Sequence, residues 1–326
     1  MLQQTWARIR RRLAPAWRWT HRTIRIRPLV CPADASWPLW KYVQWRIWYD
    51  RDPRLIAFED KLTVKDLARR CGVPTVPVLA ELDAATFDPE TAPELQPSRF
   101  VLKTNHGYND VVFVERLAQG GCRLGGHYLR GEHADWGEAR GVLRAYFSDW
   151  LTRVHSQSEW AVTQIAPRRV FAEPWLSLQD DYKVWVVRGR ATFIFTFADR
   201  WDSRPIVGIF DREWRSLGPV NRTVHAYGEA ARERVNERFP RPAGLDRLIR
   251  HAEALVPRDM DFMRVDFYPT EDGDFLLGEG TAYQNAGLPV CPDDVELQLG
   301  QMILRRWRET RPPGRNEPAE PGICTN

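Results

Sequence analysis

Apolar side chains recur at helical spacing through residues 137–156, GEARGVLRAYFSDWLTRVHS. They form one continuous stripe, which is typical of a helix with one face buried in a core. The stripe consists of Val142, Leu143, Tyr146, Phe147, Trp150, Leu151 and Val154. We therefore predict a core-facing helix in this segment.

Three further segments have helical patterns. Residues 37–55, WPLWKYVQWRIWYDRDPRL, are rich in tryptophan and predict one or two packed helices. Residues 244–256, GLDRLIRHAEALV, are amphipathic. The third segment ends at Gly72 with Pro74 just beyond, a typical helix stop. Its apolar stripe comprises Leu62, Val64, Leu67, Ala68 and Cys71.

Strand patterns alternate with these helices. Residues 99–117, RFVLKTNHGYNDVVFVERL, predict a strand, a polar turn and a second strand. Residues 168–201 predict a strand that ends at Ala172, a linker at 173–178 and a hairpin that turns at Arg188-Gly189. Hairpins in a mixed order of strands and helices favour an α+β fold over a regular βαβ series.

The last hairpin, in FMRVDFYPTEDGDFLLGEGTAYQNAG (residues 262–287), carries one acid on each strand. Pairing about a two-residue turn at Asp272-Gly273 places Asp266 opposite Glu279 and Arg264 opposite Thr281. Alternation of side chains then puts these four residues on one face of the sheet.

Two carboxylates directly opposite each other repel, so this pair needs an explanation. The acids could hold divalent cations, share a proton as a dyad, or form an exposed surface pair. The flanking strands are apolar, and burial makes an uncompensated pair costly, so we favour a metal site. Arg264 could hold an anion beside the metal.

Composition places the chain among soluble globular proteins, with 43% hydrophobic and 28% charged residues. No apolar run approaches the roughly 18 residues of a membrane helix, and the N-terminus lacks the pattern of a secretory signal. The five cysteines are scattered and odd in number, which indicates a reducing compartment. We expect a cytoplasmic protein.

Charge is concentrated in residues 1–27, which hold eight arginines and no acid. This segment could be a solvated or packed basic arm, could lie on an anionic membrane at its inner face, or could bind nucleic acid. We do not expect a nucleic-acid partner, and the membrane is a possible one.

Lysine is rare: of 47 cationic residues only Lys41, Lys61, Lys65, Lys103 and Lys183 are lysines. A lysine kept in so arginine-biased a chain is a candidate for a compact ammonium at a site. Lys103 opens the loop KTNHGYND, whose backbone N–H groups could cradle phosphate; the alternative is a plain hairpin with a lysine at its rim.

In five stretches the chain resembles the ATP-grasp superfamily, and within it the branch named for teichuronopeptide biosynthesis (TupA-like). These stretches are FEDKLTVKDLARRCGVPTVP, FVLKTNHGYNDVVFV, RVFAEPWL, DYKVWVVRG and FMRVDFYPTEDGDFLLGEGT, in the family's order. The resemblance implies an ATP-grasp fold in which two α+β subdomains grip ATP, preceded by a helical and basic extension.

The resemblance also implies the nucleotide site. Lys61 and Lys103 match the two ATP-grasp lysines, of which the second contacts phosphates. The loop with His106 and Gly107 matches the lid over the phosphates. Glu173 and Leu176 match the linker that contacts adenine, and Asp181 matches the residue that holds the ribose.

The catalytic and metal residues are implied in the same way. Lys183 and Arg200 would face the transferred phosphate, and Arg264 matches an arginine that stabilises the reacting oxyanion. Asp266 and Glu279 match ligands of two Mg²⁺ ions. Thr281 stands where the superfamily usually has an amide, so Thr281, water or Asn285 would complete the metal site.

We expect five regions. They are a basic arm at 1–30, a mostly helical region at 31–95, a small subdomain at 96–176, a large subdomain at 177–310 and a disordered tail at 311–326. The implied activity is ATP- and Mg²⁺-dependent ligation of a carboxylate and an amine through an acyl-phosphate, with a cell-envelope polysaccharide or a related small acid as acceptor. A kinase on the same fold and a nucleotide-sugar-dependent glycosyltransferase remain alternatives.

Overall fold

The computed structural model describes six stretches of the chain. They are residues 36–82, 98–153, 158–176, 180–198, 206–219 and 238–310. The basic arm, the tail and Arg200 lie outside the described residues.

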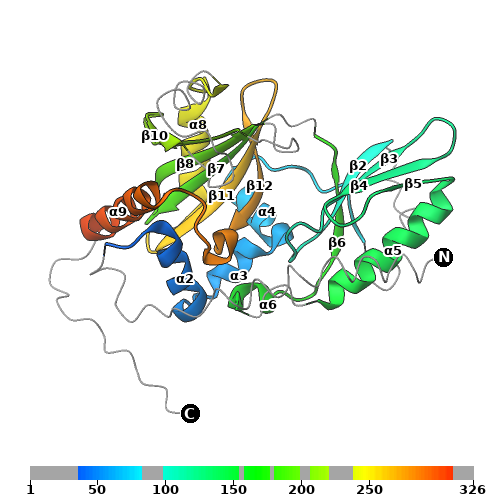
Figure 1. Ribbon diagram of the computed structural model, residues 1–326, viewed down its shortest axis with the longest axis horizontal. Coiled ribbons are helices and arrows are strands. Elements are labelled where there is room, and N and C mark those ends of the chain that lie inside the picture. Colours follow the sequence, from blue (N-terminus) through cyan, green and yellow to red (C-terminus); the bar gives the residue numbers. More distant parts are fainter. Residues whose placement is uncertain are drawn as a thin grey trace, which may run out of the picture.

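The fold is built on two antiparallel sheets, and with the helices around them it confirms the α+β class (Figure 1). The N-terminal sheet has the strand order β1-β6-β2-β3-β4-β5. Its strands are β1 Ala80–Leu82, β2 Arg99–Thr104, β3 Val112–Arg116, β4 Cys122–Gly126, β5 Gly131–His133 and β6 Val170–Pro174.

The C-terminal sheet has the strand order β10-β9-β8-β7-β11-β12. Its strands are β7 Asp180–Val187, β8 Arg190–Ala198, β9 Ile206–Asp211, β10 Ser216–Pro219, β11 Phe262–Pro269 and β12 Phe275–Thr281. The predicted turn between β7 and β8 is confirmed. Arg188 and Gly189 both have positive φ (49° and 69°), as a tight two-residue hairpin turn requires.

The helices of the described residues lie around and between the sheets. They are α2 Leu39–Tyr49, α3 Arg54–Glu59, α4 Lys61–Arg70, α5 Trp136–Thr152, α6 Trp160–Thr163, α8 Leu245–Leu255 and α9 Asp293–Thr310, with a 3₁₀ turn at Gln284–Gly287. Strands β9 and β10 and helices α6 and α9 were not predicted from the sequence. Within the described part of the chain, none of the helices combines the length and the apolarity that crossing a membrane requires.

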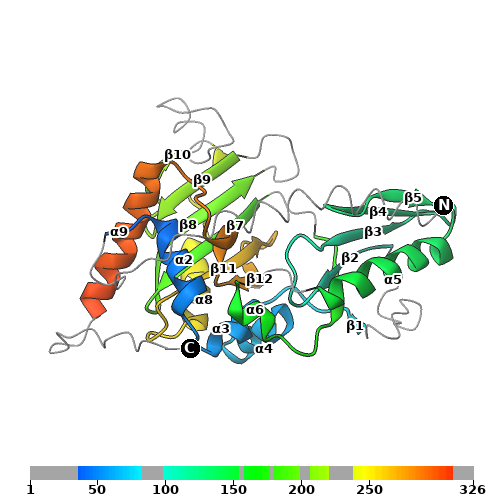
Figure 2. The ribbon, with the colours of Figure 1, turned by 60° about the horizontal axis from the view of Figure 1, so that its bottom comes forward.

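Helix α5 covers one face of the N-terminal sheet (Figures 1 and 2), as its apolar stripe predicts. Leu143, Tyr146, Phe147 and Trp150 are buried in the core between helix and sheet. Gly141, on the same helix, has open space around it.

Helix α4 buries a face that matches the predicted one only in part. Asp60 caps its N-terminus by accepting hydrogen bonds from the N–H groups of Leu62 and Thr63. The buried residues are Lys61, Val64, Lys65 and Ala68, whereas Leu62 and Leu67 are only partly buried and Cys71 is exposed. Val64 and Ala68 of the predicted stripe are thus confirmed as buried, and two lysines with buried partners complete the inner face of the helix.

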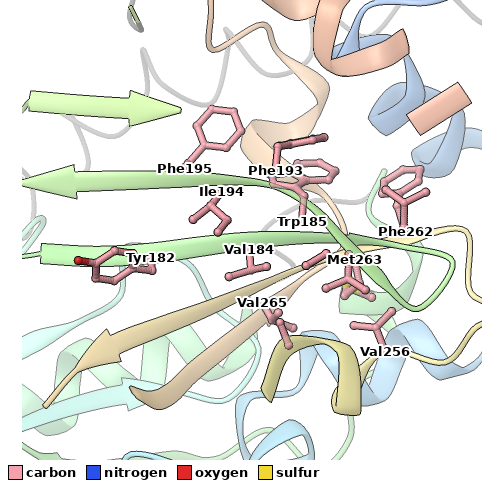
Figure 3. Close-up of a cluster of buried hydrophobic side chains, with 14 of the residues drawn as sticks. Tyr182, Val184, Trp185, Phe193, Ile194, Phe195, Val256, Phe262, Met263 and Val265 are labelled. Atoms are coloured by element: carbon pink, nitrogen blue, oxygen red, sulfur yellow. The ribbon is translucent and has the colours of Figure 1, made fainter. Parts of the chain in front are cut away.

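The C-terminal sheet buries apolar side chains on both faces (Figure 3), and the face that carries Trp185 also bears the charged residues Lys183, Arg264 and Asp266. Trp185, Phe193 and Phe262 group on one side of the strands, and Trp185 stacks between the other two rings at centroid distances of 5.3 and 5.7 Å. Val265 and Val256 lie on the other side, where α8 packs against β7 and β8.

Short helices and one extended segment join the two sheets. Figures 1 and 2 show α3, α4 and α6 between them. Helix α4 packs against β12, and the chain that follows it exchanges hydrogen bonds with that strand. Val76 N–H donates to Leu277 O (3.0 Å), and Leu277 N–H donates to Pro74 O (2.8 Å). The same segment then enters β1 of the other sheet.

Candidate active site

The hairpin of β11 and β12 has the predicted pairing at its charged end. Asp266 lies opposite Glu279, and Arg264 lies opposite Thr281. The predicted two-residue turn is wrong. Thr270 N–H donates to Asp274 O (2.9 Å) and Gly273 has φ of 77°, so the loop contains three residues and ends in a left-handed glycine.

A β-bulge reconciles the longer loop with the predicted pairing. The register shifts between Asp266 and Phe267, because Phe267 lies opposite Leu277 while Asp266 lies opposite Glu279. Gly278 is the extra residue. A ladder continued without the bulge would place Gly278 opposite Asp266 and turn Glu279 to the other face, so the bulge brings the two acids together.

Asp266 is buried and paired with two cations. Its carboxylate accepts hydrogen bonds from Arg264 (Nε to Oδ1 2.7 Å, Nη2 to Oδ2 2.9 Å) and from Lys183 Nζ (2.6 Å to Oδ2). Burial by itself raises the pKa of Asp266, but Arg264 and Lys183 outweigh it and lower the pKa to about 2. Lys183 Nζ also lies 2.9 Å from Asp181 Oδ2.

The two opposed acids therefore differ in their surroundings. The Glu279 side chain is 31% exposed, and its only ion-pair partner within the described residues is Arg264, at 3.8 Å. Arg264 Nη2 also donates to Thr281 Oγ1 (3.0 Å). The arginine thus connects all three polar positions of the face and compensates the repulsion between Asp266 and Glu279.

These residues fit a Mg²⁺ ion that takes its remaining ligands from phosphate and water. No group of three His, Cys, Asp or Glu side chains suited to a metal ion occurs in the part of the chain that is described. Mg²⁺ commonly uses only one or two carboxylates together with phosphates, which Glu279 and Asp266 provide. Asn285 is exposed and its amide donates to Leu288 O (3.3 Å), so Thr281 is the nearer candidate for a third protein oxygen.

A second buried ionic group lies on the N-terminal sheet. Glu173 of β6 forms ion pairs with two lysines. Its Oε1 lies 2.8 Å from Lys65 Nζ, and its Oε2 lies 2.5 Å from Lys103 Nζ. Lys65 also donates to Val76 O (2.9 Å). Burial lowers the pKa of Lys65. Burial also acts to lower the pKa of Lys103, but the charge of Glu173 outweighs burial there, so the pKa of Lys103 is raised.

The two charged groups approach each other at the junction of the sheets. Tyr268 and Glu279, on β11 and β12, are close enough to Lys103 to help raise its pKa. The face of the C-terminal sheet that carries Lys183 and Asp266 is therefore directed toward the lysines of the N-terminal sheet. A small anionic ligand between them would meet cations from both sides.

The loop between β2 and β3 is held tightly beside this junction. Asp110 accepts a hydrogen bond from Thr104 N–H (2.7 Å), and Lys61 Nζ donates to Gly107 O. A Cβ atom on Gly107 would lie 2.5 Å from Thr104 Oγ1 and 2.6 Å from Asp110 Oδ2. Glycine is therefore required there for the loop to fold this closely.

His106 lies inside this loop rather than on its surface, and it is 3% exposed. Burial, with the nearby Arg168, lowers the pKa of His106 to about 4. A neutral, buried imidazole has no charge to offer a phosphate, so its part is to pack the loop.

The predicted site residues are otherwise distributed over both sheets. Glu173 belongs to β6, which extends two residues beyond the predicted strand end at Ala172, so its side chain faces the lysines. Leu176 is partly buried just after β6. Sequence reasoning assigned no role to Lys65, although its rarity and its spacing of four residues from Lys61 placed both lysines on one helical face.

Sequence reasoning also missed two acids. Glu59 ends α3, and its Oε1 accepts a hydrogen bond from Ala282 N–H. Glu159 precedes α6 and is 6% exposed. Glu59 stands in the stretch FEDKLTVKDLARRCGVPTVP without an assigned role, and Glu159 stands in none of the five stretches. Helix α3 packs against both β12 and α6.

No protein-family model matches this chain, and no curated protein matches it by sequence. Solved structures with a related arrangement include PsnB, an ATP-grasp ligase complexed with a phosphomimetic variant of its minimal precursor, Mg and ADP. PsnB is 12% identical, with a TM-score of 0.38, and the match covers 78% of this chain and 61% of PsnB. This chain thus spans about three fifths of PsnB.

Two other structures are similar to a comparable degree. The D-alanine–D-alanine ligase from Bacillus anthracis, complexed with ATP, is 18% identical, with coverage of 78% and 70% and a TM-score of 0.38. The D-cycloserine synthetase DcsG is 14% identical, with coverage of 77% and 70% and a TM-score of 0.37. These identities and TM-scores are low, and the function proposed below therefore rests on this chain's own residues.

Proposed function

We propose that this protein is an ATP- and Mg²⁺-dependent carboxylate–amine ligase of the ATP-grasp type. One observation carries the proposal. Lys103 and Glu173 of the N-terminal sheet, with Lys65 of helix α4, lie across the junction from Lys183, Asp266, Arg264 and Glu279 of the C-terminal sheet. The sequence stretches that resemble the ATP-grasp superfamily supply these same residues.

In this proposal the small subdomain at 96–176 and the large subdomain at 177–310 hold ATP between them. Lys61 and Lys103 neutralise phosphate oxygens, and the loop with Gly107 covers them. Glu173, Leu176 and Asp181 belong to the adenine and ribose side. Asp266, Glu279 and Thr281 would hold Mg²⁺, which would supply charge neutralisation of the phosphates.

The remaining cations act on the reacting groups. Lys183 is assigned to the transferred phosphate, as is Arg200 from the sequence resemblance alone, and Arg264 is assigned to the oxyanion. An oxygen of the acceptor carboxylate forms a bond to the γ-phosphorus of ATP, the bond from that phosphorus to the bridging oxygen breaks, and ADP leaves, which gives an acyl-phosphate. The amine nitrogen then forms a C–N bond to its carbonyl carbon, inorganic phosphate leaves, and the amine loses a proton. Such transfer needs positioning and charge neutralisation more than a protein nucleophile.

The deciding experiment measures phosphate release from ATP by the purified protein against paired carboxylates and amines, with and without Mg²⁺. Release that requires Mg²⁺ and both substrates supports a ligase, and release that requires a hydroxyl acceptor alone identifies a kinase. Glu279→Gln removes the exposed acid of the metal pair and should lower kcat at least roughly a hundredfold. Glu132→Gln, an exposed change far from the junction, is the control. Full activity of Glu279→Gln would refute the metal assignment.

The finer part of the proposal concerns the acceptor. We infer from the resemblance to the TupA-like branch that the carboxylate belongs to a cell-envelope polysaccharide or a related small acid. Residues 1–27, with eight arginines and no acid, would bring the protein to an anionic membrane surface. Deletion of residues 1–27 should then weaken sedimentation with vesicles that contain phosphatidylglycerol. Unchanged sedimentation would remove the membrane from the proposal.

A further inference from the structure

The chain that leaves strand β12 is held in place by two helices. Glu59, the last residue of α3, accepts a hydrogen bond from Ala282 N–H through Oε1. Gln44 of α2 donates from Nε2 to Gly287 O (3.1 Å). Residues 282–287 are therefore fixed at both ends, directly after Thr281 of the proposed metal site.

Three consecutive residues of this segment have a left-handed backbone. Their φ angles are 48° at Asn285, 51° at Ala286 and 71° at Gly287. Glycine adopts this conformation freely, but for Ala286 it is unfavourable because the Cβ atom crowds the following carbonyl. Such strain persists where the surrounding contacts impose it, and it is concentrated at functional sites. The strained turn directly follows Gln284 and fixes the backbone from which that side chain extends.

Gln284 contacts the arginine of the metal-binding face. Gln284 is 8% exposed, and its Oε1 accepts a hydrogen bond from Arg264 Nη1 (3.5 Å). A guanidinium has donors only, so the amide presents its oxygen to the arginine and leaves the two N–H donors of Nε2 available. Nε2 has no acceptor within the described residues. Unlike the unpartnered amide oxygen of Gln44, it is not fully buried.

Two donor groups with unused N–H bonds therefore lie side by side. Arg264 uses Nε and Nη2 for Asp266 and Nη2 also for Thr281, whereas Gln284 is the only hydrogen-bond partner of Nη1 in the part of the chain that the structure describes. Each terminal nitrogen of a guanidinium carries two N–H bonds, so one of them remains free on Nη1. With Nε2 of Gln284 it forms a pair of donors suited to the oxygens of a carboxylate.

We propose that Gln284, together with Arg264, binds the carboxylate of the acceptor substrate. This inference rests on the proposed ligase activity, and it adds a donor that the sequence resemblance does not supply. Nε2 donates to the carboxylate oxygen that becomes the carbonyl oxygen of the acyl-phosphate, while the other oxygen bonds to the γ-phosphorus. When the amine nitrogen adds to the carbonyl carbon, the same oxygen takes up the negative charge, and the amide is already in place to stabilise it.

The first test uses acetate as a minimal carboxylate and does not require turnover. Acetate binding to the full-length protein is measured by saturation-transfer NMR, with and without ADP and Mg²⁺. Wild type should bind acetate under both conditions, and Gln284→Leu should weaken binding at least roughly tenfold, as the loss of a hydrogen bond to a charged group predicts. Gln301→Leu, at an exposed position of α9, should bind acetate like wild type. Equal acetate binding in wild type and Gln284→Leu would overturn the proposal, and so would displacement of acetate by ADP.

The second test separates a contact with the substrate from support of Arg264. Gln284→Glu keeps an oxygen for Arg264 but replaces the N–H donors by a negative charge. With ATP and a carboxylate–amine pair that wild type ligates, Gln284→Leu should raise KM for the carboxylate at least roughly tenfold and Gln284→Glu should raise it further, because glutamate repels the acceptor. KM for ATP should stay within about twofold in both variants. Glutamate is close to glutamine in size, so it also serves if leucine impairs folding.

The outcomes separate this site from the ligase activity. Wild-type kinetics in Gln284→Glu would show that the residue only supports Arg264, which would refute the carboxylate contact and leave the ligase standing. A wild type without ATP turnover, but with acetate binding that depends on Gln284, would refute the ligase and support the carboxylate site.

Discussion

At the scale of single residues, four of the five lysines occupy buried or ion-paired positions. Lys61, Lys65 and Lys183 are all buried, and Lys103 is ion-paired with the buried Glu173. A lysine ammonium fits such positions because it is compact and can direct its donors to several acceptors, whereas a guanidinium needs a planar slot. The sequence indicated this through rarity alone, and it could not show that Lys65 shares Glu173 with Lys103.

Lys65 should stabilise the fold as well as position Glu173. Changing Lys65 to Met leaves Glu173 with one cation and removes the bond to Val76 O, so the free energy of unfolding should fall by about 3 kcal/mol. Denaturant unfolding followed by circular dichroism measures this. Lys41→Met is the matched control, because Lys41 is only partly buried and contacts the Trp37 ring at 5.0 Å; it should change stability by about 1 kcal/mol or less. Equal effects of the two changes would contradict a special role for Lys65.

His106 should make stability depend on pH. Its pKa is lowered from 6.5 to about 4 in the folded protein, so the unfolded chain binds a proton first as the pH falls. The stability that depends on a neutral His106 is fully present above pH 6.5, and it is lost as the pH falls toward about 4. It amounts to up to about 3 kcal/mol at the low end of that window.

The comparison of wild type with His106→Gln isolates this contribution. Unfolding free energies of both proteins are measured at pH 7 and pH 4.5. Wild type should lose about 2–3 kcal/mol more than the variant between the two values, because glutamine binds no proton. Parallel losses in both proteins would show that His106 is not held neutral.

At the scale of elements, local patterns predicted most helices and hairpins but misjudged two details that matter for the site. Helix α4 was placed correctly, yet its buried face follows the partners of Lys61 and Lys65 rather than its leucines. The last hairpin was paired correctly at Asp266, although both its turn and its regularity differ from the prediction. A bulge depends on how a strand packs, which the sequence of that strand does not encode in a short motif.

Gly278 should be required for the bulge. An added Cβ would lie 2.5 Å from the Tyr268 ring, so Gly278→Ala should lower the free energy of unfolding by about 1–3 kcal/mol. Gly141→Ala in α5 is the control with the opposite sign. Nothing lies within 4 Å of its added Cβ, so this change should stabilise the protein by about 0.5–1 kcal/mol.

Denaturant unfolding of both alanine variants measures these effects. Tyr268→Ala should relieve part of the cost of Gly278→Ala in a double-mutant cycle, because it removes the clashing ring. Additive effects of the two changes would mean that the glycine is kept for its backbone alone.

At the scale of the whole molecule, the site exists only where the two sheets meet. Its residues come from α3 and α4, from β2 and β6 of one sheet, and from β7, β11 and β12 of the other. Residues separated by more than 150 positions, such as Lys103 and Glu279, affect each other's charge there. A ligand bound between the sheets should therefore stabilise the molecule as a unit.

ADP together with Mg²⁺ should raise the melting temperature of the protein. A ligand at about a hundred times its Kd contributes about 2.7 kcal/mol when it binds only the folded state. Mg²⁺ should add to the effect of ADP because it joins the phosphates to Glu279 and Asp266. Differential scanning fluorimetry measures the shift. Glu279→Gln should lose the increment due to Mg²⁺ and keep that due to ADP, and Glu132→Gln should behave like wild type. A shift independent of Mg²⁺ in wild type would contradict a shared nucleotide and metal site.

The sequence by itself determined the α+β class, the helices other than α6 and α9, the hairpins other than the β9-β10 pair, and the pairing of Asp266 with Glu279. These follow from periodicity, caps and turn residues, which act over a few positions along the chain. Only the tertiary structure decided that Lys61 and Lys65 belong to the buried face of α4 and that Glu173 joins Lys65 to Lys103. These features depend on contacts between segments that are distant in the sequence. Burial, rather than spacing along the chain, decides which charged side chains pair with each other.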